Sequence, residues 1–189
     1  MFDKKNETPA AETVSLPEIK NLVRTVIWAA LIGVGGWLSI PLPGVPVSLQ
    51  TFFLVLAGII EGPKTGAQAA GLYLLAGFLG LPIFAGGLGG PAILMSPSAG
   101  FALAFPLGAA SAGWLARRPA EGVLTFRRAL AAALLGLFVI FPLGLIGMII
   151  NTQMAPQAAA LLLLNFVPGD LAKALAAASI SSSRTFRRT

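Results

Sequence analysis

Apolar residues in this chain gather in long runs rather than in short alternating stretches. The runs measure roughly 16 to 25 residues, and most charged residues fall between them. A helix needs ~20 apolar residues to cross the ~30 Å hydrocarbon core of a bilayer. Backbone groups in lipid must satisfy their own hydrogen bonds, so runs of this length are predicted to be helices. Membrane barrels are built from ~10-residue segments of alternating polarity, a pattern that is absent here.

The pattern predicts an all-α integral membrane protein with six transmembrane helices. Residues 1–20 are predicted to be an N-terminal tail, 21–181 a single six-helix membrane domain, and 182–189 a basic C-terminal tail. An alternative places the start of the last spanning helix at Pro168, because Pro suits the first turn of a helix. Residues 157–166 would then form a short apolar helix at the outer surface. The six predicted spans are 21–40, 46–61, 65–82, 97–116, 128–150 and 157–181.

Composition supports a membrane protein and narrows the chemistry. Of 189 residues, 56% are hydrophobic and only 11% are charged, whereas soluble domains carry roughly 25% charged residues. The chain has no Cys and no His, which excludes disulfides, thiol catalysis and Cys/His zinc sites. We therefore expect no metal site and no cofactor. The acidic residues of the N-terminal tail do not fit a cleaved signal peptide, so we expect the tail to be retained.

The basic residues predict the orientation. Of the thirteen Lys and Arg residues, all but Lys173 lie in the two tails, at the start of the first span, or in the loops after the second and fourth spans. The positive-inside rule then places both termini in the cytoplasm of a multi-pass protein of the cell membrane. The net charge of +6 is a topology signal, favoured by anionic lipid headgroups, and indicates no nucleic-acid partner.

Asp170 and Lys173 are the two charged residues that lie away from the predicted cytoplasmic side. They are spaced i and i+3, so they share one helix face. A charge inside a membrane costs at least ~2.5–3.5 kcal/mol on insertion scales, and is therefore a candidate functional site. The pair either fixes helix packing or binds a ligand from the outer side. A carboxylate accepts and an ammonium donates, so such a ligand would carry N–H donors and a carbonyl or carboxylate.

A few uncharged side chains could complete a pocket. Singly, each is more typical of a packing or interfacial residue, but together they indicate a pocket lining on the outer half of the membrane. They are Gln50, Thr51, Tyr73, Ser98 and Asn151.

The Gly-rich segment from Phe84 to Pro91, which contains Gly86 and Gly87, is a second candidate feature. It is not a phosphate-binding loop, because no strand precedes it and no basic residue is near. Gly permits close approach of the backbone to a ligand. The segment is therefore predicted to be either a connector or a lid over the pocket.

Ala29 and Gly33 form a small-xxx-small face in the first span. Such faces allow two helices to approach closely. Most of them pack within one chain, but this one could instead dock a partner subunit.

Four segments make the chain resemble the BioY family, the biotin-binding S components of energy-coupling-factor (ECF) transporters. The resemblance implies six helices, an outward pocket for biotin covered by the first and third loops, and docking of the first helix on a transmembrane coupling subunit through an Ala-x-x-x-Ala face, here Ala29 and Gly33. Where the family usually has Gly-Pro-Thr-Gly-Gly-Tyr, this chain keeps a hydroxyl at Ser98 and replaces the Tyr with Phe101. The segments are 40–51, 61–66, 80–90 and 168–173.

The residue chemistry agrees with biotin as the ligand that the resemblance implies. Asp170 can accept from a ureido N–H, and Lys173 can donate to the ureido carbonyl or to the valerate carboxylate. Gln50 and Asn151 are uncharged partners for the other polar end. Aromatic residues such as Tyr73 and Phe84 would cover the thiophane ring, and apolar burial contributes ~25 cal/mol per Å².

The sequence predicts a capture subunit and not an enzyme. It contains no Gly-Lys pair, which the ATP-binding motif G-x-x-x-x-G-K-[ST] requires, so ABC-type ATPase subunits would be separate chains. Two other transport functions remain open: an S component for another vitamin, and a self-sufficient secondary transporter with Asp170 as the proton carrier. A membrane enzyme would lack a plausible acid/base pair.

Overall fold

The structure of the chain is a computed structural model that describes residues 15–41, 46–117 and 123–183. Most of both predicted tails, part of the first loop and part of the loop after the fourth span lie outside the described residues. Within the described part the chain is mainly helical, as the sequence predicts. The helices are α1 (Leu16–Trp37), α2 (Gln50–Glu61), α3 (Pro63–Phe78), α4 (Ala99–Ala116), α5 (Phe126–Thr152), α6 (Pro156–Leu164) and α7 (Val167–Ser182).

Short elements complete the fold. Strands β1 (Ser39–Ile40) and β2 (Val47–Ser48) pair antiparallel, with Ser39 opposite Ser48. Two 3₁₀ helices, η1 (Ala85–Gly87) and η2 (Pro91–Met95), lie between α3 and α4. The strand pair is a small exception to the all-α prediction.

Helix α2 begins four residues later than the predicted span 46–61. Residues 47–48 pair with β1, and the backbone N–H of Leu49 donates to the carbonyl of Leu38 at 3.1 Å. The apolar pattern does not distinguish this strand from a first helical turn. Because α2 has 12 residues, its length is about 18 Å, which is shorter than the hydrocarbon core.

Helix α1 begins earlier than predicted, at Leu16 rather than at residue 21. The carboxylate of Glu18 accepts from the backbone N–H of Ser15 at 2.8 Å and from its hydroxyl at 2.7 Å. This capping box satisfies donors at the start of the helix. The polar first turn explains why the apolar pattern alone placed the start too late.

The predicted span 157–181 is broken into two helices, which agrees with the alternative start of the last helix near Pro168. Helices α6 and α7 meet at a 47° bend, and Pro168 lies in the first turn of α7. Among the described residues, α1, α4 and α5 are long and apolar enough to cross a membrane, and the bent pair α6–α7 is a fourth candidate if it counts as one span.

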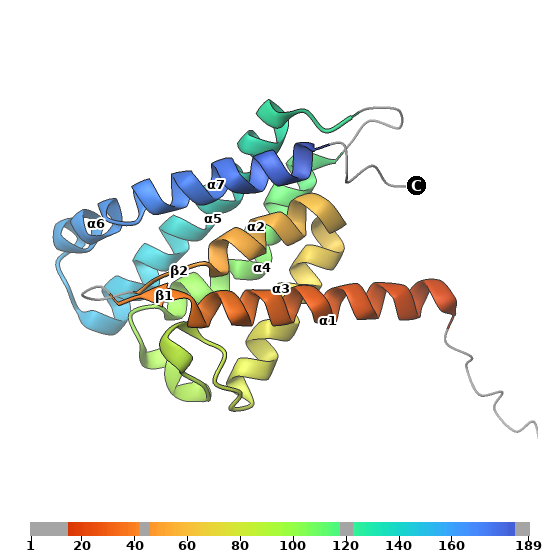
Figure 1. The fold of residues 1–189 in the computed structure, drawn as a ribbon. Coiled ribbons are helices and arrows are strands. Elements are labelled where there is room, and N and C mark those ends of the chain that lie inside the picture. The colour runs from red at the N-terminus through yellow and green to blue at the C-terminus, as the bar shows by residue number, and fades with distance from the viewer. Residues whose placement is uncertain (1–14, 42–45, 118–122, 184–189) are drawn as a thin grey trace, which may run out of the picture.

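The helices are arranged around α4, which packs against α2, α3 and α5. In Figure 1, α1 and α7 lie on opposite sides of the molecule, with α2, α4 and α5 between them. The start of α1 and the end of α7 lie at one end, whereas the strand pair and α6 lie at the other. Large apolar side chains such as Phe138 (71% exposed) and Trp114 (61% exposed) face outward, an arrangement suited to lipid contact.

Candidate functional site

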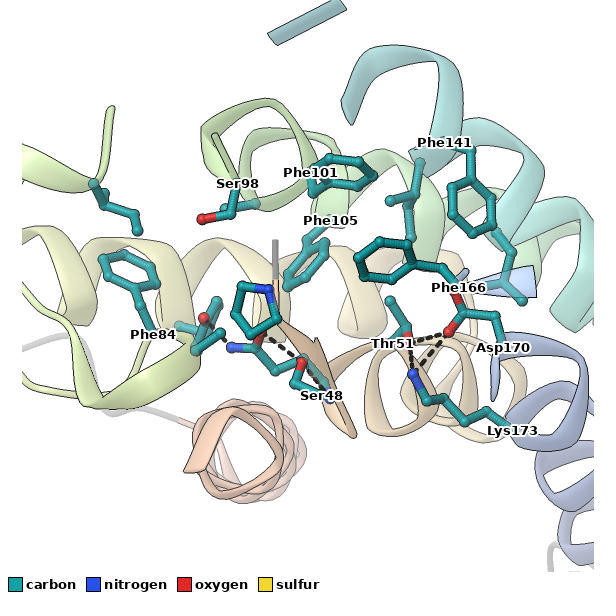
Figure 2. A pocket seen from close by; sticks show the side chains of 18 residues that line it. Ser48, Thr51, Phe84, Ser98, Phe101, Phe105, Phe141, Phe166, Asp170 and Lys173 are labelled. Carbon is teal, nitrogen blue, oxygen red and sulfur yellow. Dashed lines mark hydrogen bonds and ion pairs between the residues drawn. The ribbon is translucent and has the colours of Figure 1, made fainter. Parts of the chain in front are cut away.

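A pocket lies among α2, α3, α4, α5 and α7, and the segment that joins α3 to α4 contributes to its lining. The space within it that a water-sized sphere can occupy is about 60 Å³. Figure 2 shows Asp170, Lys173 and Thr51 on one side and Phe84 and Ser98 on the other. The lining residues are Pro46, Ser48, Gln50, Thr51, Tyr73, Phe84, Ala85, Ile93, Ser98, Phe101, Ala102, Phe105, Leu137, Ile140, Phe141, Phe166, Asp170 and Lys173.

Asp170, Lys173 and Thr51 form a closed hydrogen-bonded triangle. Lys173 Nζ lies 2.8 Å from Asp170 Oδ1 and 3.2 Å from Thr51 Oγ1, and the Thr51 hydroxyl donates to the same Oδ1 at 2.9 Å. The side chains of Lys173 and Asp170 are only 10% and 7% exposed. Ion pairs removed from water in this way need such additional hydrogen bonds to offset their desolvation.

The start of α7 explains the position of the carboxylate. Asp170 lies in the first turn of α7 and its backbone N–H donates to the carbonyl of Phe166 at 2.9 Å. Thr51 lies in the first turn of α2. The carboxylate therefore belongs to the first turn of α7 and accepts from a side chain in the first turn of α2, and the dipole at a helix N-terminus favours a negative charge.

A second polar group lies at Gln50 and Tyr73, which are 5% and 1% exposed. Gln50 Nε2 donates to the Tyr73 hydroxyl, and the Ser48 hydroxyl donates to Gln50 Oε1 at 3.1 Å. An amide nitrogen carries two protons and a phenol one. No described residue accepts from the Tyr73 O–H or from the second N–H of Gln50, so both remain available as donors.

Aromatic rings form the apolar walls. Tyr73 lies 5.5 Å from Phe84 in an edge arrangement and 6.0 Å from Phe105 in a stacked one, between ring centroids. Phe101 and Phe141 meet edge to face at 6.5 Å. The pocket can thus bury an apolar ring system between two polar groups.

The structure brings most of the predicted site residues into this one pocket. These residues come from distant parts of the chain. They are carried into the pocket by α2, α3, the α3–α4 segment, the start of α4, and α7. The predicted residues that line it are Gln50, Thr51, Tyr73, Phe84, Ser98, Asp170 and Lys173.

Gly86 and Gly87 lie outside the lining. They are exposed and have φ of 76° and 75°, a conformation that Gly adopts readily. Their turn lets the N–H of Phe84 donate to the carbonyl of Leu88 at 2.9 Å. In this structure the two glycines shape the loop that carries Phe84 and Ala85 into the pocket.

Asn151 also lies outside the lining. Its Nδ2 donates to the carbonyls of Leu94 and Ser96, at 2.7 and 2.8 Å. Both of its amide protons are used in this way, so the residue fastens the segment before α4 to α5. The expected role as a partner for the ligand's second polar end therefore has no support in this geometry.

The predicted docking face of α1 is internal. Ala29 is 8% exposed, and a Cβ on Gly33 would lie 3.3 Å from Cβ of Ile83. Gly at this position allows the α3–α4 segment to approach the helix closely. Ala29 and Gly33 are thus covered by the protein's own chain, as is usual for small-residue faces.

Sequence reasoning missed most of the apolar lining. Phe105, Ile140, Phe141 and Phe166 lie within apolar runs, where no polar neighbour marks them. Phe101 and Phe105 are spaced i and i+4, so they share a helix face. That spacing is the one signal that could have suggested a common wall, and it is equally typical of a packed core.

Comparisons with known proteins agree with this architecture. The family model described as the BioY family matches residues 5–188. The biotin transporter BioY of Thermotoga maritima is 37% identical over 163 residues, covering 86% of this chain and 94% of its own length. The biotin transporter BioY of Rhizobium etli is 34% identical over 167 residues, covering 84% and 89%.

A solved structure matches the fold. The crystal structure of the S-component for biotin from an ECF-type ABC transporter superposes with a TM-score of 0.81 at 26% identity, covering 93% of this chain and 96% of that chain. The family match, the relatives and the fold agree over nearly the full length. This chain is a member of the BioY family.

Proposed function

We propose that the chain is the membrane-embedded substrate-capture component of a biotin uptake system. The relatives are named biotin transporters and the solved structure is an S-component for biotin. The observation that carries the proposal is the buried Asp170–Lys173 pair in a pocket that is otherwise mainly apolar. Such a pair matches a ligand whose polar group both donates and accepts.

The ureido ring of biotin fits the unused hydrogen-bonding capacity of the pair. Both bonds to the carboxylate end on Oδ1, and no bond from a described residue reaches Oδ2. That oxygen can accept from a ureido N–H. Lys173 uses two of its three donors, so the third can reach the ureido carbonyl.

The remaining parts of biotin match the remaining parts of the pocket. The rings of Tyr73, Phe84 and Phe105 suit the thiophane ring and the valerate methylenes, whose burial contributes ~25 cal/mol per Å². The free donors on Tyr73 and Gln50 suit an acceptor, for which the valerate carboxylate is the candidate.

We also propose six membrane-embedded helical segments, with α6 and α7 as the sixth, and both termini in the cytoplasm. The start of α1 and the end of α7 lie at the same end of the molecule in Figure 1, as this topology requires. The distribution of Lys and Arg places that end in the cytoplasm, so in the proposed topology the pocket opens to the outside. Reporter fusions near Leu88 and Gln153 should then report the outside, and a cytoplasmic signal at Leu88 would overturn the orientation.

Uptake in this proposal depends on separate subunits. The chain lacks a Gly-Lys pair and thus the usual ATP-binding loop, and its relative comes from an ECF-type ABC transporter. A transmembrane coupling subunit and ABC-type ATPase subunits would therefore complete the transporter.

Calorimetry with the purified chain in detergent tests the proposed ligand. Wild type should bind biotin in preference to other vitamins. The double variant Asp170→Asn with Lys173→Met leaves no unpaired charge, so it should fold but bind poorly. Wild-type affinity in a well-folded double variant would remove the pair from the ligand site, and tighter binding of another vitamin would overturn the assignment of biotin.

A further inference from the structure

The ring of Phe101 rests against a glycine on the neighbouring helix. Phe101 lies on α4 and lines the pocket (Figure 2), whereas Gly144 lies on α5 outside the lining. A Cβ on Gly144 would lie 2.2 Å from Cδ1 and 2.3 Å from Cε1 of Phe101. Carbon atoms normally approach to about 3.5–4.0 Å. The ring therefore occupies the space that any side chain at position 144 would need.

The two helices cannot separate easily to relieve such a clash. On one side of Gly144, a Cβ on Gly147 would lie 2.5 Å from Cα of Gly100. On the other side, a Cβ on Gly136 would lie 2.9 Å from the carbonyl oxygen of Gly108. Both are backbone contacts, and close packing of this kind has little slack. The separation of α4 and α5 is thus fixed both before and after Gly144.

The pocket is the open side available to a displaced Phe101 ring. Gly144 and α5 lie behind the ring, and Phe141 meets it edge to face at 6.5 Å between centroids. Movement away from α5 would bring the ring into the open volume that it lines.

We propose that Gly144 is a positioning residue that determines the width of the pocket by letting Phe101 lie back against α5. It does so without touching the ligand. A side chain at position 144 narrows the pocket and changes which ring systems fit. The identity of the ligand rests on the function proposed above, whereas the position of the Phe101 ring does not.

The test compares Gly144→Ala with Gly71→Ala by calorimetry. Gly71 lies on α3, and a Cβ there would meet nothing within 4 Å, so this variant is a matched control for adding a methyl group to a helix. Biotin affinity should fall about 10- to 200-fold in Gly144→Ala, the usual effect of one methylene in an apolar pocket, and stay within about threefold in Gly71→Ala. The affinity for desthiobiotin, which lacks the closed sulfur ring, should fall less in Gly144→Ala than the affinity for biotin.

A second variant separates pocket width from general damage. In the background Phe101→Leu, the change Gly144→Ala should have little further effect, because the ring that it displaces is gone. If Gly144→Ala alone fails to fold, the comparison of Phe101→Leu with the double variant Phe101→Leu, Gly144→Ala still tests the proposal. Unchanged biotin affinity in Gly144→Ala, equal loss for both ligands, or an undiminished loss in the Phe101→Leu background would overturn the proposal.

A crystal structure of Gly144→Ala provides a readout that needs no ligand. The Phe101 ring should move toward the pocket, and a ring left in place would overturn the proposal. If wild type fails to bind biotin while the ring moves as expected, the proposed function is wrong and the role of Gly144 stands.

Discussion

The described structure contains two ion pairs of similar chemistry in contrasting surroundings. Lys173 Nζ lies 2.8 Å from Asp170 Oδ1 within one turn of α7, and the two side chains are 10% and 7% exposed. Arg24 Nη1 lies 3.5 Å from Glu61 Oε2 and joins α1 to α2, and these side chains are 56% and 12% exposed. The Trp28 indole N–H also donates to Glu61 at 3.3 Å.

The contrast supports the proposal that the buried pair contacts the ligand. Arg24–Glu61 joins two helices at a lower desolvation cost, because the Arg side chain is more than half exposed. Asp170 and Lys173 belong to the same helix turn, so their ion pair by itself joins nothing. It requires desolvation of two charges. Among the described residues, its hydrogen bonds reach α2 only through the Thr51 hydroxyl. A buried pair with so little packing benefit is better explained by ligand binding.

The largest effect is expected for Lys173→Met. This change leaves the carboxylate of Asp170 buried without its cation, which typically costs about 3–5 kcal/mol. Biotin binding should fall below detection by calorimetry, and thermal unfolding in detergent should shift to lower temperature. Arg24→Met is the matched control and should keep wild-type affinity. Equal effects of the two variants on binding would remove the distinction between the pairs.

Asp170→Asn should have the next largest effect. It keeps the shape of the side chain but replaces a charged acceptor with an amide, whose N–H₂ can face a ureido N–H. Hydrogen bonds to charged groups contribute ~1.5–3 kcal/mol, so the biotin dissociation constant should rise about 10- to 150-fold. A change of less than threefold, measured by calorimetry, would mean that the carboxylate does not contact the ligand.

Thr51→Val tests the link between the pair and α2. Valine preserves the shape but removes the hydroxyl that donates to Asp170 and accepts from Lys173. Without it both charged groups lose orientation, so affinity should fall about 5- to 30-fold, equivalent to about 1–2 kcal/mol. Thr51→Ser retains the hydroxyl and should bind within about threefold of wild type. If serine is as harmful as valine, the methyl group and not the hydroxyl is the important part.

The smallest effect is expected for Glu61→Gln. The amide oxygen can still accept from Trp28, and partly exposed ion pairs contribute about 0.2–1 kcal/mol. The free energy of unfolding should fall by no more than this, and biotin affinity should not change. A tenfold loss of binding would show that the α1–α2 contact influences the pocket, and that the two ion pairs are coupled.

The sequence was sufficient wherever the determining physics is local. Long apolar runs require helices in lipid, so the helices of the described structure were predicted with shifts at their ends. The spacing of Asp170 and Lys173 places them on one helix face whatever surrounds them. Pro168 similarly indicated the break before α7, because its missing N–H suits the first turn of a helix.

The tertiary structure decided which polar side chains meet. Gln50 and Asn151 are both amides at ends of apolar helices, yet Gln50 lines the pocket and Asn151 fastens a loop. Gly33 faces inward against Ile83, and Ala29 is buried in the apolar core. In each case the outcome depends on the rotation of one helix against its neighbours, which local pattern does not specify.

Sequence alone determined that this chain is a helical membrane protein with one acid–base pair on a helix face. The tertiary structure alone decided that Thr51, 119 residues from Asp170, closes that pair into a triangle, and that the ring of Phe101 packs against Gly144. The physical reason is range. Helix formation and i, i+3 spacing depend on neighbouring residues, whereas the width and polarity of a pocket depend on contacts between helices that only the packed chain brings together.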